Sequence, residues 1–230
     1  PDKPFEGREG LWHNLAAEAP KWEAFGGGAE PFRITATSFK AYPSVIHTQG
    51  PIGLVLELRE KAAAAQIDSV HVATYGEAVQ RTASETEKWH PETRETADHS
   101  MPYLVAAAWQ DGEVTPATFA QSRIQDSALR PLITKLTIGE EPEFTRRYPA
   151  ESCSRIEVKT TDGRRVAAAT NPPKGHRHNP LSDREVESKF RGLASAALGA
   201  QGCARVLDEV WNLENATTLD RLFESVVIAR

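Results

Sequence analysis

The sequence predicts an α+β fold, in which a small mixed unit of strands and helices lies between two flanking helical segments. Three observations lead to this prediction. A helical pattern in residues 1–30 ends at the break "GGGAEP", strand and helix patterns alternate over residues 31–180, and two helical patterns fill residues 181–230. The flanking helices would bury only each other, so we expect them to belong to a larger all-α body that is mostly missing or supplied by another chain.

The elements of the first part of the chain follow from hydrophobic spacing. "GLWHNLAAEAPKW", residues 10–22, has apolar residues at helical intervals. "FRITATSFK", residues 32–40, alternates apolar and polar side chains, which predicts a strand that ends at Lys40. "GPIGLVLELREKAAAA", residues 50–65, predicts a helix, since apolar positions fall on neighbouring turns and proline is tolerated in a first turn.

The middle of the chain combines a strand with a helix. "IDSVHVATY", residues 67–75, is rich in β-branched side chains and predicts a second strand. A helix is expected over Pro102–Gln110, and Asp111-Gly112 should end it. We expect Trp89 and Trp109 to be core residues rather than stacking platforms.

The last third contains the clearest local signals. "SRIEVKTTDGRRVAAAT", residues 154–170, predicts a β-hairpin that turns at Asp162-Gly163. "NPPKGHRHNPL" holds too many prolines for anything but a loop. "SDREVESKF" then begins with the Ser-x-x-Glu pattern of a helix capping box, and two helices are expected over 183–198 and from 203 to the end.

Composition excludes several function classes. A formal net charge of −5 without a basic stripe argues against nucleic-acid binding, and apolar runs of about six residues are too short to cross a membrane. Two cysteines make neither a disulfide framework nor a C-x-x-C metal site, which favours ordinary thiols in a reducing cytoplasm. No signal peptide is visible, and the missing initiator methionine indicates a processed product or a piece of a longer chain.

The stretch "SFKAYPSVIHTQGP" places Lys40, His47 and Gln49 just before a predicted helix N-terminus. Backbone N–H groups and the helix dipole favour an anion there, and these side chains suit a carboxylate. The alternative is a solvated lysine and a histidine that only satisfies the helix end.

The stretch "HPETRETADHSMPY", residues 90–103, is dense in titratable groups at the entry of the next helix. Asp98 either orients His99 or caps the helix. Capping explains Asp98 but leaves Arg94 unexplained.

The loop "KGHRH", residues 174–178, has two histidines but no further ligands at a recognisable spacing, so we predict no metal site. A basic loop over an anionic ligand and a plain surface loop both remain open. No phosphate loop and no nucleophile elbow are present.

Four of these segments together resemble the MmgE/PrpD family, which includes 2-methylcitrate dehydratases and cis-aconitate decarboxylase. The segments are "FEGREGLW" (5–12), "FKAYPSVIHTQ" (39–49), "WHPETRETADHSMPY" (89–103) and "NPPKGHRHNPLSDREVESKFR" (171–191). They occur in the family's order and cover essentially the whole chain. "IHTQ" and "RETADHS" are more similar to the 2-methylcitrate dehydratase branch than to the decarboxylase.

The resemblance implies a large all-helical domain with a smaller α+β lid, and a substrate bound between the two. It also implies enzymes that act on tricarboxylic acids without a cofactor. Family chains are much longer than this one, which begins near the end of the helical domain. Catalytic residues of that domain therefore lie outside this sequence.

Dehydration of a hydroxy tricarboxylate needs a base for a C–H proton, an acid for the departing hydroxyl, and cations for the carboxylates. On this chemistry we assign carboxylate binding to Lys40 and Arg94. Proton transfer falls to His47, or to His99 held by Asp98. Tyr42 and Gln49 are further candidate hydrogen-bond donors.

Several alternatives stay open. Asp98 and His99 have either a catalytic or a purely structural role. The chain is either part of a dehydratase, a non-catalytic lid fragment, or a family member acting as a decarboxylase or isomerase. We expect a homodimer in the cytoplasm with a small tricarboxylate substrate, no cofactor, and neither nucleic acid nor membrane as partner.

Overall fold

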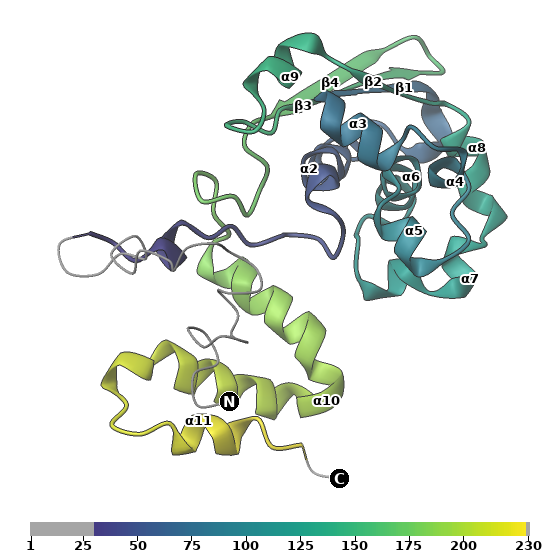
Figure 1. The fold of residues 1–230 in the computed structure, drawn as a ribbon. Coiled ribbons are helices and arrows are strands. Elements are labelled where there is room, and N and C mark those ends of the chain that lie inside the picture. The colour runs from purple at the N-terminus through teal and green to yellow at the C-terminus, as the bar shows by residue number, and fades with distance from the viewer. Residues whose placement is uncertain (1–29, 229–230) are drawn as a thin grey trace, which may run out of the picture. The chain divides into compact units, whose positions relative to one another are not determined.

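The computed structural model describes residues 30–228, in which the predicted α+β class is confirmed. The chain divides into two compact units, residues 1–38 and 39–230, and all candidate site residues belong to the second. The second unit contains one four-stranded mixed sheet, which is packed against helices (Figure 1). The helix predicted over residues 10–22 lies outside the described residues. The predicted domain boundaries at 30 and 180 stay predictions.

The elements of the second unit follow one another with short connections. In chain order they are η3 (Ile46–Thr48), α2 (Gln49–Leu58), η4 (Ala64–Gln66), β1 (Ile67–Thr74), α3 (Gly76–Thr82), α4 (Thr86–Trp89), α5 (Arg94–Asp98), α6 (Met101–Asp111), η5 (Pro116–Phe119), α7 (Gln121–Ile124), η6 (Ser127–Leu129), α8 (Arg130–Ile133), β2 (Leu136–Glu140), α9 (Pro142–Arg147), β3 (Ser154–Thr160), β4 (Arg165–Thr170), α10 (Asp183–Trp211), η7 (Leu213–Asn215) and α11 (Asp220–Ser225).

The sheet has the strand order β2-β1-β3-β4. The predicted strand at β1 and the predicted hairpin of β3 and β4 are confirmed, with Gly163 in the turn at a φ of 86°. β2 was not predicted. It pairs in parallel with β1, Val70 opposite Leu136, and this long-range pairing has no local turn signal.

The hydrophobic core lies on the helical side of the sheet. Figure 1 shows α2, α3 and α6 on one side of the strands, and β3 buries every second residue towards them. Trp109 of α6, Ile52 of α2 and Ile156 of β3 are almost fully buried, and each such side chain contributes about 1.5–3 kcal/mol to folding. The indole Nε1 of Trp109 donates to the carbonyl of Ala62 at 2.9 Å, which confirms Trp109 as a core residue.

The strand predicted over residues 32–40 is wrong. Residues 33–36 form a short 3₁₀ helix, η2 (Arg33–Ala36), whose side chains are exposed. Backbone N–H groups of Thr35 and Thr37 donate to carbonyls of Phe32 and Ile34, both at 3.0 Å. These local bonds use the donors that a strand would offer to a neighbour, so alternation alone did not produce sheet pairing. Lys40 therefore does not end a strand.

One of the two alternatives for Asp98, that it caps α6, is wrong. Ser100 caps this helix, because its Oγ accepts the backbone N–H of Tyr103 at 3.1 Å. Asp98 is instead the last residue of α5. Gly112 ends α6 in the left-handed conformation, as predicted from Asp111-Gly112.

The C-terminal helices match the sequence pattern in part. The helix predicted from residue 203 to the end is wrong as one element, because α10 ends at Trp211 and η7 and α11 follow separately. The capping box of Ser182 and Glu185 is present at the start of α10. Gly199 interrupts α10 with a φ of 66° and a ψ of 173°, which divides it where the two predicted helices were separated. Among the described residues, no helix combines the length and the apolar character that a bilayer crossing demands.

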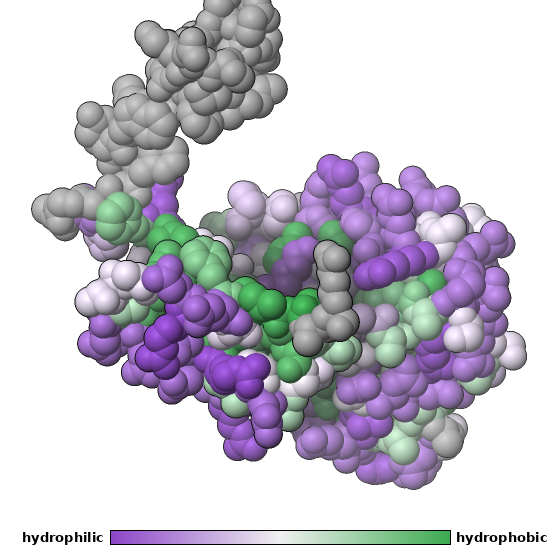
Figure 2. Space-filling model, turned by 90° about the horizontal axis from the view of Figure 1, so that it is seen from below, coloured by the Kyte–Doolittle hydropathy of each residue, from purple (hydrophilic) through white to green (hydrophobic). Residues whose placement is uncertain are grey.

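Helices α10 and α11 leave apolar side chains in solvent. Figure 2 shows hydrophobic surface gathered in the middle of one face, between hydrophilic regions. The exposed apolar residues of the C-terminal helices include Leu193, Val210, Trp211, Leu219 and Phe223, which is 63% exposed.

We expect the isolated chain to bind a hydrophobic dye strongly or to associate as its concentration rises, because large apolar side chains of these helices are exposed to solvent. Fluorescence titration and light scattering from 1 to roughly 100 µM measure both effects. Phe223→Ser should reduce them, whereas Arg221→Ser on the same helix is the matched control. A monomer at all concentrations that binds no dye contradicts the expectation.

Candidate active site

A cavity of about 760 Å³ lies between the loop at residues 40–45, the junction of α5 with α6, and the first half of α10. This volume falls within the range of small-molecule sites. The polar and charged groups on its wall are Lys40, Tyr42, Ser44, Asp98, His99, Glu113, Thr115, Lys174, Glu185, Ser188 and Lys189.

Lys40 is held in this wall by its backbone. The N–H of Phe39 donates to the carbonyl of Gly175 at 2.8 Å, and Lys189 Nζ donates to the carbonyl of Lys40 at 2.5 Å. A Cβ at Gly175 would lie 1.9 Å from the Phe39 carbonyl oxygen, so only glycine permits this crossing. The "KGHRH" loop and the loop of Lys40, far apart in sequence, are thereby brought together.

Gln49 fixes the shape of the loop that carries Tyr42. Its Oε1 accepts the N–H of Tyr42 at 3.0 Å, and its Nε2 donates to the carbonyl of Tyr42 and to Ser44 Oγ, both at 3.0 Å. Burial, and the nearby charge of Glu185, raise the pKa of Tyr42, so its phenol stays protonated and can donate. Gln49 is 2% exposed, and its amide is already used by this loop. Its predicted role in substrate binding stays a prediction.

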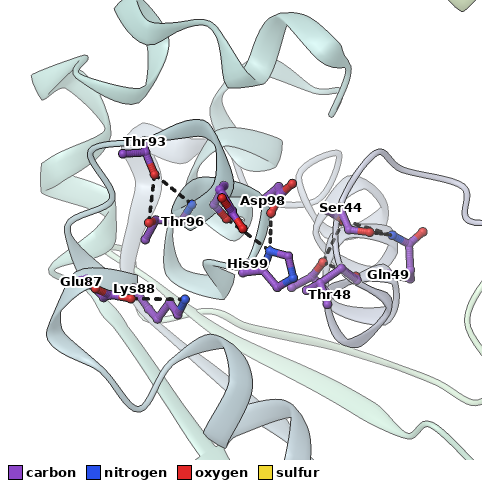
Figure 3. A network of polar contacts seen from close by, with 11 residues as sticks. Ser44, Thr48, Gln49, Glu87, Lys88, Thr93, Thr96, Asp98 and His99 are labelled. Atoms are coloured by element: carbon purple, nitrogen blue, oxygen red, sulfur yellow. Dashed lines mark hydrogen bonds and ion pairs between the residues drawn. The ribbon is translucent and has the colours of Figure 1, made fainter. Parts of the chain in front are cut away.

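Asp98 and His99 face the same loop, as Figure 3 shows. The Asp98 carboxylate and His99 Nδ1 are in direct contact, and the Asp98 carbonyl accepts the N–H of Val45 at 3.0 Å. Since a carboxylate only accepts, Nδ1 carries the proton, and Nε2 is left as the acceptor nitrogen. The side chain of His99 is 45% exposed and borders the cavity, so this nitrogen is in a position to take a proton.

The remaining charges of the cavity are partly neutralised. Lys174 pairs with Glu185 at 2.9 Å, and hydrogen bonds from Ser182, with those of Lys174, lower the pKa of Glu185 to about 2. Lys189 is bonded to the Lys40 carbonyl. Among the described residues, the Lys40 ammonium is left as a cation of this wall without such a partner.

His47 lies beside the cavity wall rather than in it. Its Nδ1 is 2.8 Å from the Tyr75 hydroxyl, and the ring is half-buried near Tyr148. Burial lowers the pKa of His47, Arg81 and His99 lower it further, and Glu77 opposes them. His47 and His99 are therefore close enough to sense each other's charge.

Arg94 and Gln49 are likewise not part of the wall of the larger cavity. Arg94 begins α5 with an exposed side chain and lines neither cavity, so its role in carboxylate binding stays a prediction. Gln49 borders a second, smaller cavity of about 220 Å³. The first turn of α2 is buried, and Gly50 in it also borders this second cavity.

The structure also adds groups that spacing did not indicate. Lys189 is one of them, and its position four residues after Glu185, on the same face of α10, is the signal that could have indicated it. Tyr75 follows β1 and contacts His47, and the strand pattern gives no sign of this contact. Glu113 follows the left-handed Gly112 and adds an acid to the cavity.

The fold is that of an α+β domain, and its cavity is of small-molecule size and is lined by acidic and basic side chains. The profile of the MmgE/PrpD C-terminal domain matches residues 42–213, and the chain belongs to the MmgE/PrpD family. The predicted resemblance to this family is thereby confirmed, and the segment at residues 5–12 lies outside the matched range.

The curated relatives reported below are named either as cis-aconitate decarboxylases or as a 2-methylcitrate dehydratase-like protein. The chain is 26% identical to the cis-aconitate decarboxylase of Mus musculus over 137 residues, which are 58% of this chain and 28% of that protein. It is 30% identical to the cis-aconitate decarboxylase-like protein oryM of Aspergillus oryzae over 139 residues, 58% of this chain and 28% of that protein. It is 28% identical to the 2-methylcitrate dehydratase-like protein oryR of the same organism over 120 residues, which are 49% of this chain and 24% of that protein. The chain thus spans about a quarter of these relatives' length.

Proposed function

We propose that the chain is the C-terminal portion of a cofactor-independent lyase of the 2-methylcitrate dehydratase type, which eliminates water from a hydroxy tricarboxylate. The observation that carries this proposal is the shared cavity of Lys40 and the Asp98–His99 pair. A cation without an acidic partner suits a substrate carboxylate, and an imidazole held by a carboxylate suits proton transfer near neutral pH.

In this proposal, each cavity residue of this chain has its own role in the reaction. Lys40 binds a carboxylate and offsets the charge that develops on it when the neighbouring C–H proton leaves. His99 takes that proton at Nε2, while Asp98 holds the ring and stabilises the imidazolium. Tyr42 donates a hydrogen bond from its protonated phenol. Further groups are supplied by the part of the protein that these 230 residues do not include.

Decarboxylation of cis-aconitate is the second candidate. It is favoured by the names of the mouse and the oryM relatives. Both reactions use a tricarboxylate and cationic groups, so the cavity by itself fits either. An isomerase and a lid that only binds an anion remain the less specific alternatives.

The test compares the 230-residue chain with the longest protein that its gene encodes. Each is incubated with 2-methylcitrate, citrate and cis-aconitate, and alkene absorbance and released CO₂ are measured. Alkene from 2-methylcitrate or citrate supports dehydration, and CO₂ from cis-aconitate supports the second candidate. In the active form, His99→Gln should lower kcat by at least about 100-fold, the usual contribution of one acid–base group. His71→Gln, an exposed histidine of β1, is the control.

We expect the activity to survive dialysis against a strong chelator. The sequence contains no cysteine cluster and no dinucleotide fingerprint. Loss of turnover that added iron or zinc restores would contradict this expectation. The homodimer, the cytoplasmic location and the absence of nucleic-acid or membrane partners stay predictions.

A further inference from the structure

Tyr75 is a buried residue whose hydroxyl makes a polar contact that core packing alone does not require. It follows β1 directly, it is 2% exposed, and its hydroxyl lies 2.8 Å from His47 Nδ1. The two rings meet edge to face, with centroids 5.7 Å apart and an interplanar angle of 64°. A buried phenol is thus aimed at one nitrogen of a half-buried imidazole.

A second tyrosine prevents Tyr75 from turning away. Tyr148 follows α9 and stacks on Tyr75 with centroids 4.3 Å apart and planes within 10°. The stack fixes the phenol ring from the face, while the backbone of β1 fixes its Cα. The hydroxyl therefore has little freedom to leave His47.

The protonation states of Tyr75 and His47 determine which of the two groups donates the hydrogen bond between them. Burial, with Tyr148 adding to it, raises the pKa of Tyr75, so the phenol keeps its proton. Burial lowers the pKa of His47, so the imidazole is neutral at pH 7. A neutral imidazole has one acceptor nitrogen and one N–H. Since the phenol keeps its proton and lies 2.8 Å from Nδ1, its O–H can donate to Nδ1 when the imidazole proton is on Nε2.

We propose that Tyr75 is a positioning residue that holds His47 in the Nε2–H tautomer, so that His47 presents a donor where His99, held by Asp98, presents an acceptor. The two histidines thereby differ through their partners on Nδ1, a phenol that donates and a carboxylate that accepts. In the dehydration proposed above, on which this role rests, His99 takes the C–H proton, and His47 stabilises the departing hydroxide by a hydrogen bond from its Nε2–H. The tautomer itself depends only on the contacts within this chain.

Other charged groups around His47 act on its charge rather than on its tautomer. Glu77 and Arg81 of α3 have opposite effects, and His99 adds repulsion when it is protonated. The ring centroid of Tyr148 lies 6.4 Å from that of His47, and Tyr148 makes no hydrogen bond to this ring among the described residues. Only the Tyr75 hydroxyl touches a ring nitrogen of His47 among the described residues.

The test uses the 230-residue chain with ¹⁵N-labelled histidine and no substrate. Long-range ¹H–¹⁵N correlation spectra at neutral pH distinguish a protonated from an unprotonated ring nitrogen, and His47→Gln identifies which of the seven histidines is His47. We expect an unprotonated Nδ1 and a protonated Nε2. Tyr75→Phe should relax His47 to a mixture of tautomers, whereas Tyr148→Phe, which keeps the stack, should leave it unchanged.

Two results would overturn the proposal. One is a wild-type His47 with its proton on Nδ1, which needs no variant and so does not depend on Tyr75→Phe folding. The other is an unchanged tautomer in Tyr75→Phe while the other six histidine signals stay in place. If the tautomer is as expected but neither tricarboxylate reacts in the longest protein, the proposed function fails and the role of Tyr75 in setting the tautomer stands.

Discussion

Lys40→Ala is expected to lower kcat/KM for the tricarboxylate by roughly 10- to 150-fold in the active form of the protein. The substitution removes a charge-assisted hydrogen bond to a carboxylate, which is worth about 1.5–3 kcal/mol. The expectation depends on the position of Lys40 in the cavity wall and on its lack of an acidic partner among the described residues. The melting temperature should barely change, because an exposed lysine contributes little to folding.

Two further variants separate charge from shape. Lys40→Arg keeps the cation and should retain more of the activity than alanine does. Lys61 is an exposed lysine that follows α2 and pairs with Glu57 of that helix. Lys61→Ala should leave turnover unchanged. If Lys40→Ala keeps kcat/KM within about twofold of the wild type, Lys40 is a surface residue and the carboxylate is bound elsewhere.

Gly175→Ala is expected to destabilise the fold by about 2–3 kcal/mol. Its φ of 88° costs a residue with a Cβ about 1–2 kcal/mol. The new methyl group would also lie 1.9 Å from the Phe39 carbonyl oxygen. Relief of this clash breaks the 2.8 Å bond from Phe39 N–H to the Gly175 carbonyl, a loss of about 1 kcal/mol. Denaturant unfolding measures the sum.

Gly163→Ala is the matched control for this clash. Gly163 has almost the same φ, 86°, in the hairpin turn, but nothing lies within 4 Å of the position of its Cβ. It should therefore show the backbone strain alone. Equal destabilisation in the two variants would mean that the contact of Gly175 with Phe39 contributes nothing. A larger effect at Gly175, together with lower activity, would show that this crossing also places Lys40.

Elements with strong local signals could be predicted from the sequence. The β3–β4 hairpin, the helix α6 with its stop at Gly112 and the capping box of α10 depend on residues a few positions apart. Their hydrogen bonds and backbone angles are satisfied within one segment, so the pattern and the structure agree. The strand expected at residues 32–40 failed for the same reason, because its hydrogen bonds closed locally into η2.

By itself, therefore, the sequence determined the α+β class, the family and the four cavity candidates Lys40, Tyr42, Asp98 and His99. Only the tertiary structure decided that the Lys40 loop is pinned by Gly175 and Lys189. It also decided that Gln49 serves the loop of Tyr42, and that His47 meets Tyr75, which lies 28 residues away in the sequence. The physical reason for the contacts of Lys40 and His47 is that they join segments far apart in the sequence, whose distance in space depends on how the elements pack, and no local spacing encodes that packing.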